Sequence, residues 1–240
     1  MTAVGRARLP IDVPLLAVSA AAWLALVVQP DETAVCVMAS MRWSPVPLLA
    51  ASTLMFAAMM VPLIGAPVAH VRDRSFAERR ARAVALFVAG YGLPWLAAGI
   101  VLLLLAAWIV ASGSALALAA AVAGIALWQV SPAKQQCLNR CHAHTELAAF
   151  GLKADLDVLR FGLTHAGWCI GACMGLMLLP MLFPRGHLAL MAAVTLWLAS
   201  ERLDRPMPAR WQWRGPAKIV RIARRQVRVW LSRSSALPQW

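Results

Sequence analysis

The chain has 240 residues, of which 61% are apolar and 14% charged, and its mean hydropathy is +0.69. A soluble domain carries about a quarter charged residues, so this composition excludes an ordinary soluble domain. The formal net charge is +13, but the basic residues lie between apolar runs, which argues against nucleic-acid binding. Long apolar runs without polar alternation exclude a membrane barrel and predict an all-α, polytopic helical membrane protein.

Six apolar stretches predict about six transmembrane helices. The first follows Arg6 and Arg8 and is expected to stay uncleaved, because no small-residue cleavage site follows it. In the second, Pro62 and Pro67 are expected to bend the helix. The spans are predicted at about residues 14–28, 46–71, 83–110, 115–130, 156–183 and 187–200, within a membrane domain of residues 1–203.

Lys and Arg are distributed unequally over the segments between these spans. Two precede the first span, five lie in residues 72–82, three in residues 131–153 and ten after Ser200. The opposite side has only Arg42 and Arg185. Because Lys and Arg concentrate on the cytoplasmic side of a membrane, both termini are predicted to be cytoplasmic.

The remaining segment, residues 204–240, mixes basic residues with tryptophan. Between residues 216 and 233 the apolar residues fall on one helical face, which predicts a basic amphipathic helix. Such a helix is expected to lie on anionic lipid headgroups of the bilayer, with docking to an acidic partner protein as the alternative. The residues expected at this surface are Arg221, Arg224, Arg225, Arg228 and Trp230.

The fifth span carries the residues with the most distinctive chemistry. His165, Cys169, Cys173 and Met177 recur every four residues and form a stripe along one helix. Thiolate, imidazole and thioether are ligands of a soft metal, with Cu(I) the first candidate and Zn(II) the second. Met59 of the second span is expected to line the same interior. The alternative is ordinary packing, because Cys and Met are common core residues.

A second CxxxC pair, Cys137 and Cys141, lies between the fourth and fifth spans. Ser131-Pro132 can begin a short helix there, with both cysteines on one side. This pair is expected near the cytoplasmic surface, whereas Cys169 lies roughly 20 Å deep on a straight helix. Two separate sites, or a relay between them, fit that topology better than one four-cysteine site. A single site would need the first pair to fold back into the membrane, or the fifth helix to begin later than predicted.

Motifs of the common enzyme classes are absent, so no enzymatic activity is expected. The sequence has no GxSxG, P-loop or HExxH, and no paired carboxylates inside a span. Asp155, Asp157 and Glu201 are expected at membrane edges, as solvated caps or paired with Arg. The lack of intramembrane charge argues against a transporter.

Four motifs carry a family resemblance: AAMMVP in the second span, YGLPW in the third, WQVSPAKQQCLNRC after the fourth and GLTHAGWCIGACMGLM in the fifth. Together with Glu201-Arg202, they resemble the predicted metal-binding integral membrane proteins, a bacterial family of unknown function whose members are often labelled copper chaperones. The resemblance covers about residues 52–202. It implies a multi-pass protein of the bacterial inner membrane with a soft-metal site.

The resemblance also implies particular site residues. The family usually has two adjacent cysteines in the fifth span, and here the first of them is Ala172. The tryptophan that commonly follows is Met174, and the arginine after the second loop cysteine is His142. The family positions that this chain retains are Cys137, Cys141, Cys169, Cys173, His165, Met59, Met60 and Lys134.

Two functions remain open from the sequence. The first is copper handling, in which Cu(I) is bound by thiolates and thioethers and passed to a copper-dependent enzyme or used in its assembly. The second is a non-catalytic accessory subunit of a larger membrane complex, in which the cysteines pack and the basic tail docks a partner.

Overall fold

The computed structural model describes residues 13–28, 45–204, 206–213 and 215, without the side chains of residues 45–48. All regular structure in these residues is helical, which confirms the all-α prediction. The predicted tail helix and Cys36 lie outside them. The helices are α1 Val13–Val28, α3 Pro45–Met59, η1 Val61–Ile64, α4 Gly65–Asp73, η2 Ala77–Arg79, α5 Arg80–Ala111, α6 Ala115–Val130, α7 Pro132–Cys141, α8 Gly151–Leu182 and α9 His187–Arg202.

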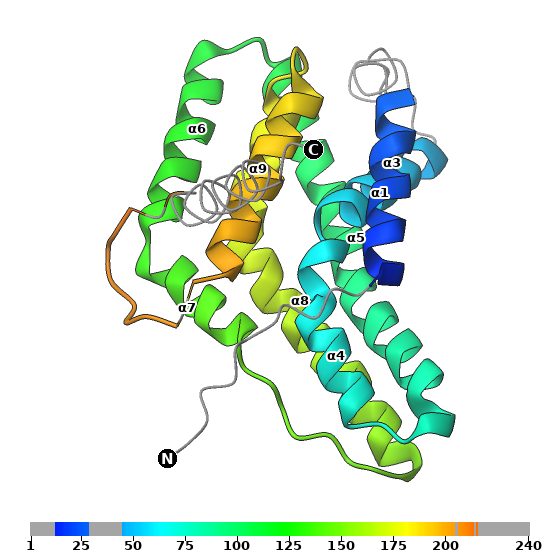
Figure 1. The fold of residues 1–240 in the computed structure, drawn as a ribbon. Helices are drawn as coiled ribbons and strands as arrows, with labels where there is room; N and C mark the ends of the chain where they lie inside the picture. Colours follow the sequence, from blue (N-terminus) through cyan, green and yellow to red (C-terminus); the bar gives the residue numbers. More distant parts are fainter. Residues whose placement is uncertain (1–12, 29–44, 205, 214, 216–240) are drawn as a thin grey trace, which may run out of the picture.

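Helix α8 is the centre of the fold. It contacts α5, α6, α7 and α9, whereas α3 and α4 pack on α5 and α1 packs on α3. Figure 1 shows α6, α7 and α9 on one side of α8, with α1, α3 and α4 on the other. In its most apolar window α8 is 61% buried, against 33% for α5. The stripe of cysteine and histidine therefore lies on the more buried of these two long helices.

Glycines allow α5 and α8 to approach closely. A Cβ added to Gly162 would lie 2.7 Å from the carbonyl oxygen of Phe87, and one added to Gly90 would lie 2.7 Å from that of Leu159. Small residues of this kind let helix backbones touch in apolar surroundings. Close backbone packing fixes the register of α8 against α5, and hence the positions of the α8 thiols.

Two described helices are long and apolar enough to cross a bilayer: residues Ala77–Ala111 and Gly151–Leu182. The number is four if each of two bent pairs is one span. The shorter α1 is also apolar. The described residues therefore contain helices of membrane length, while the predicted total of six spans stays a prediction.

The first bent pair is the predicted second span. It is not one straight helix, because α3 and the η1–α4 segment meet at an angle of 51°. Pro62 lies in the 3₁₀ turn at the bend, which confirms the expected effect of this proline. The predicted fifth span also differs in its start, since α8 begins at Gly151 and not near residue 156.

The second bend, of 59°, separates α6 from α7. The Ser131 hydroxyl accepts a hydrogen bond from the backbone N–H of Lys134 at 3.1 Å and donates one to the carbonyl of Trp128 at 2.8 Å. Pro132 follows in the first turn of α7, where its missing N–H costs nothing. The Ser-Pro pair therefore ends one helix and starts the next, confirming the predicted short helix.

Candidate functional site

The α8 stripe points into the protein. Cys169, Cys173 and Met177 are at most 1% exposed, and His165 is 3% exposed. The sulfurs of Cys169 and Cys173 lie 3.9 Å apart, one helical turn from each other. Two buried sulfurs at this separation form the nucleus of the candidate site.

Helix α7 brings a third thiol to this pair. The Cys141 side chain is 6% exposed, and its thiol lies close enough to that of Cys169 for the two groups to interact electrostatically. A Cβ added to Gly171 would lie 2.7 Å from the sulfur of Cys137, so α7 also meets α8 one turn farther back. The sequence left open whether the two cysteine pairs lie apart or together. The bend after α6 folds α7 onto α8 and brings the two pairs near each other (Figure 1).

Two donors converge on the sulfur of Cys169. The guanidinium Nη2 of Arg202 lies 2.6 Å from Cys169 Sγ and 3.8 Å from Cys173 Sγ. The Tyr91 hydroxyl donates to Cys169 Sγ at 3.0 Å. A sulfur that accepts from a cation and a hydroxyl sits in surroundings suited to a thiolate. Sequence reasoning did not assign this role to Arg202 or Tyr91.

A buried ion pair holds α7 beside α9. Lys134 Nζ lies 2.8 Å from the Glu201 carboxylate, and their side chains are 0% and 1% exposed. Gln129 of α6 contacts both, with Lys134 Nζ donating to its Oε1 and its Nε2 donating to Glu201. Trp197 Nε1 donates to the same carboxylate at 3.2 Å. The ion pair and its two further polar partners, Gln129 and Trp197, offset the cost of burying charge in this apolar place.

The ion pair corrects two expectations. Glu201 is neither a solvated cap nor an arginine partner, and buried charge is present in the bundle. The sequence did contain a signal, namely one lysine just after the fourth span and one glutamate at the end of the sixth. Asp155, in contrast, pairs as expected, with Arg79 at 2.5 Å and Arg82 at 2.6 Å.

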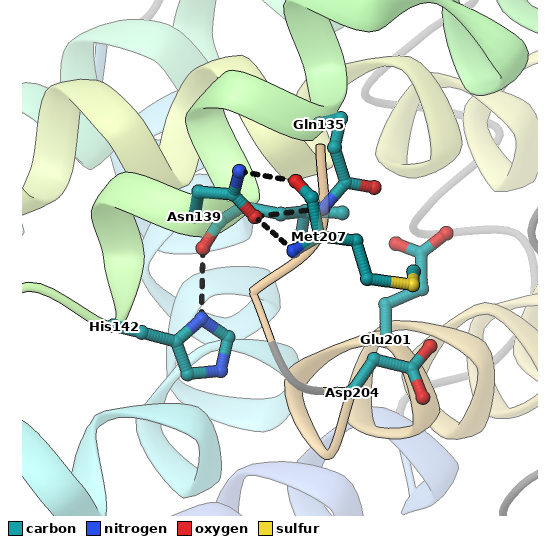
Figure 2. Close-up of a pocket in the computed structure, with 7 residues that line it drawn as sticks. Gln135, Asn139, His142, Glu201, Asp204 and Met207 are labelled. Atoms are coloured by element: carbon teal, nitrogen blue, oxygen red, sulfur yellow. Dashed lines mark hydrogen bonds between the residues drawn. The ribbon is translucent and has the colours of Figure 1, made fainter. Parts of the chain in front are cut away.

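A shallow pocket lies where α7 meets the end of α9 (Figure 2). Asn139 holds the segment after α9 by accepting from the backbone N–H of Met207 at 3.1 Å and donating to its carbonyl at 2.7 Å. The His142 ring lies between the carbonyls of Leu138 and Arg202, at 2.9 and 3.1 Å. The lining residues are Gln135, Leu138, Asn139, His142, Glu201, Asp204 and Met207.

The remaining predicted ligands are buried at different places. His165 packs among Phe87, Tyr91 and Phe161, with ring centroids 5.7 to 6.3 Å away. Met59 of α3 is fully buried in the core that also contains Met177. Within the described part of the chain, no three or more His, Cys, Asp and Glu side chains form a group that could hold a metal ion.

Two histidines near the N-terminal half of α8 were not singled out as a pair from the sequence. The rings of His70 and His144 lie 4.7 Å apart, and both are near the ring of Phe161. His144 lies in the loop before α8, where partial burial and the nearby His70 lower its pKa. A neutral imidazole keeps a lone pair free for a metal.

These features define an all-helical protein with helices of membrane length and buried thiols at its centre. A family model described as PpoB2, copper chaperone, matches residues 49–221, which is more than half of the chain. The chain therefore belongs to this copper chaperone family, and the resemblance seen in its sequence is confirmed. The description names a chaperone, which is a role without catalysis. Comparison with curated proteins and with solved structures gave no match.

Proposed function

We propose that the protein is an inner-membrane copper chaperone that holds Cu(I) as cargo at the Cys169–Cys173 thiol pair of α8, beside the thiols of α7. The observation that carries this proposal is the 3.9 Å separation of the Cys169 and Cys173 sulfurs, with Cys141 beside Cys169. Thiolates select Cu(I), which forms complexes with few ligands, whereas Zn(II) in a structural site takes four. A close pair of buried thiols therefore suits Cu(I) better than Zn(II).

The neighbouring residues provide further soft ligands, from the half-buried Cys137 to the buried Met177, along which copper can reach and leave this pair. Cys137 is half-buried on the same helix as Cys141 and is the thiol best placed to meet incoming copper. Met177 continues the stripe one turn beyond Cys173 and offers a thioether, a soft ligand. His165 lies one turn before Cys169. Copper moves along these residues by exchange between ligands and leaves toward a copper-dependent enzyme.

The test is Cu(I) binding by the purified full-length protein in detergent under anaerobic conditions. Competition with the chromophoric chelator bicinchoninate should give one tightly bound Cu(I) per chain. The double variant Cys169→Ser/Cys173→Ser should lose this binding. Cys36→Ser removes a thiol outside both CxxxC pairs and should keep it. Unchanged copper stoichiometry in the double variant would contradict the proposal.

The proposal includes six spans with both termini in the bacterial cytoplasm. In Figure 1 the α4–α5 connection and the start of α8 lie at one end of the bundle, and the connections α5–α6 and α8–α9 lie at the other. The α4–α5 connection at the first end carries the arginines of residues 72–82, whereas the two described connections at the second end carry Arg185 alone. Alkaline phosphatase fused after Ser112 should be active, and a fusion after Ser75 should be inactive. The reverse pattern would refute this orientation.

The basic tail is proposed to bind anionic lipid headgroups. Its support is the arrangement of apolar and basic residues within residues 216–233. Trypsin should cleave the tail of the full-length protein more slowly in detergent micelles that contain phosphatidylglycerol than in neutral micelles. Equal cleavage in both would favour the alternative, in which the tail docks an acidic membrane protein partner.

A further inference from the structure

Arg202 is placed to balance charge at the thiols. Its guanidinium approaches both Cys169 and Cys173, and the groups that act on it electrostatically are Cys169, Cys141, Cys173 and Tyr91. The carboxylate next to it in sequence, Glu201, is turned to Lys134. The positive charge of Arg202 therefore belongs to the thiol cluster and is not matched by the neighbouring ion pair.

The balance of charge depends on which ion binds. Cu(I) with the thiolates of Cys169 and Cys173 carries one negative charge, which the guanidinium of Arg202 cancels. A divalent ion with the same two thiolates is already neutral, so the guanidinium would remain as an uncompensated charge. Buried charge without a partner is strongly unfavourable. The same pair of thiols is therefore electrostatically matched to a monovalent ion.

A third thiolate would change the net charge of the metal ion and its ligands. Zn(II) with three thiolates also carries one negative charge and would match Arg202. However, the described His, Cys, Asp and Glu side chains do not gather in threes around a place for a metal ion. Cys141 contacts Cys169, while the close sulfur pair facing Arg202 is that of Cys169 and Cys173. The geometry thus favours two thiolates.

We infer that Arg202 is a specificity-determining residue, whose charge favours a monovalent soft ion over divalent ions at the Cys169–Cys173 pair. This inference rests on the proposed copper function and adds the reason for its metal selectivity. Arg202 does not bind the metal. It acts through the electrostatic energy of the loaded site.

The first experiment compares variants of the full-length protein in detergent. Affinities for Cu(I) and Zn(II) are measured by chelator competition in wild type, Arg202→Gln and Arg202→Lys. The Gln variant should bind Cu(I) about ten- to a hundredfold more weakly, the size of one lost charge interaction in a partly buried site. Its affinity for Zn(II) should stay the same or rise. The Lys variant keeps the charge and should retain most of the Cu(I) selectivity.

Two controls separate charge from structure. Arg210→Gln removes an exposed arginine on the segment after α9 and should change neither affinity. Arg185→Gln removes an exposed arginine from the connection between α8 and α9, outside the site, and should likewise change neither affinity. An equal loss of both metals in Arg202→Gln would overturn the inference, as would an unchanged affinity for Cu(I).

A second measurement uses the wild-type protein alone, so it does not depend on how the variants fold. Ag(I) is a soft monovalent ion and Cd(II) a soft divalent ion, and thiolates bind both. Ag(I) should displace Cu(I) from the protein, and an equal concentration of Cd(II) should not. Displacement by Cd(II) would overturn the inference while leaving copper binding itself intact. A wild-type protein that binds no Cu(I) would overturn the proposed function as well.

Discussion

Lys134 and Glu201 place their charged groups 2.8 Å apart, 67 residues apart in sequence, where neither side chain is open to solvent. Removing one partner leaves the other as a buried, unpaired charge. We expect Lys134→Met and Glu201→Gln each to lower the free energy of unfolding by about 3–5 kcal/mol. Denaturant titration in detergent, followed by circular dichroism, measures this loss.

The double variant Lys134→Met/Glu201→Gln supplies the control. It removes both charges and should be less destabilised than the sum of the single variants. Additive losses, within about 0.5 kcal/mol, would mean that the two residues do not interact.

The contact between α5 and α8 gives a second prediction. Gly162→Ala introduces a methyl group 2.7 Å from the backbone oxygen of Phe87, which a side-chain movement cannot relieve. We expect a loss of about 1–3 kcal/mol in unfolding free energy. Gly167→Ala, on the exposed face of the same helix, meets no atom within 4 Å and should be neutral or slightly stabilising. Equal stability of the two variants would refute the close approach.

Thiol reactivity should follow burial. Cys137 is half-buried, whereas Cys141, Cys169 and Cys173 are buried. In single-cysteine variants of the folded protein, N-ethylmaleimide should label Cys137 at least about tenfold faster than Cys173, because a buried thiol reacts only after local opening. Mass spectrometry at timed intervals measures the rates. Equal rates would place α7 away from α8.

The histidine pair predicts a dependence on pH. Burial, and secondly the charge of His70, lower the pKa of His144 below its ordinary value of about 6.5. The unfolded chain therefore binds this proton more readily. The contribution of His144 to stability is complete above pH 6.5 and is lost as the pH falls through its folded-state pKa.

Nuclear magnetic resonance titration of histidine ring signals tests this. His70→Gln should raise the pKa of His144 in part, because burial is the larger cause and remains. A pKa of His144 that does not change in the variant would show that the two rings do not interact.

The helices could be predicted from the sequence because their causes are local. Apolar runs locate them, Pro62 marks one bend, and Ser131-Pro132 marks another. The direction that α7 takes after its bend is not local. It depends on the ion pair of Lys134 with Glu201 and on the contact of α7 with α8. A periodicity along one helix cannot predict either interaction.

In the candidate site, likewise, contacts within one helix could be predicted from the sequence, and contacts between helices could not. Spacing of four residues predicted that Cys169 and Cys173 lie together. The contacts of Cys169 with Tyr91 and Arg202 join residues 78 and 33 positions apart, and no pattern in the sequence pairs them. Glu201 was misjudged because hydropathy placed it at a membrane edge. An edge residue is solvated only if no other helix covers it, and here α7 does.

Two adjacent residues in the last turn of α9 contact two different helices. Glu201 holds Lys134 of α7, and the adjacent Arg202 holds the thiols of α8. Five residues later, the backbone of Met207 forms two hydrogen bonds with the side-chain amide of Asn139 on α7. The segment after α9 is therefore joined to α7 as well as to α9, and both helices contact α8, which carries the buried thiols. A displacement of this segment would act on α7 and on the last turn of α9, the two elements whose Cys141 and Arg202 lie beside Cys169.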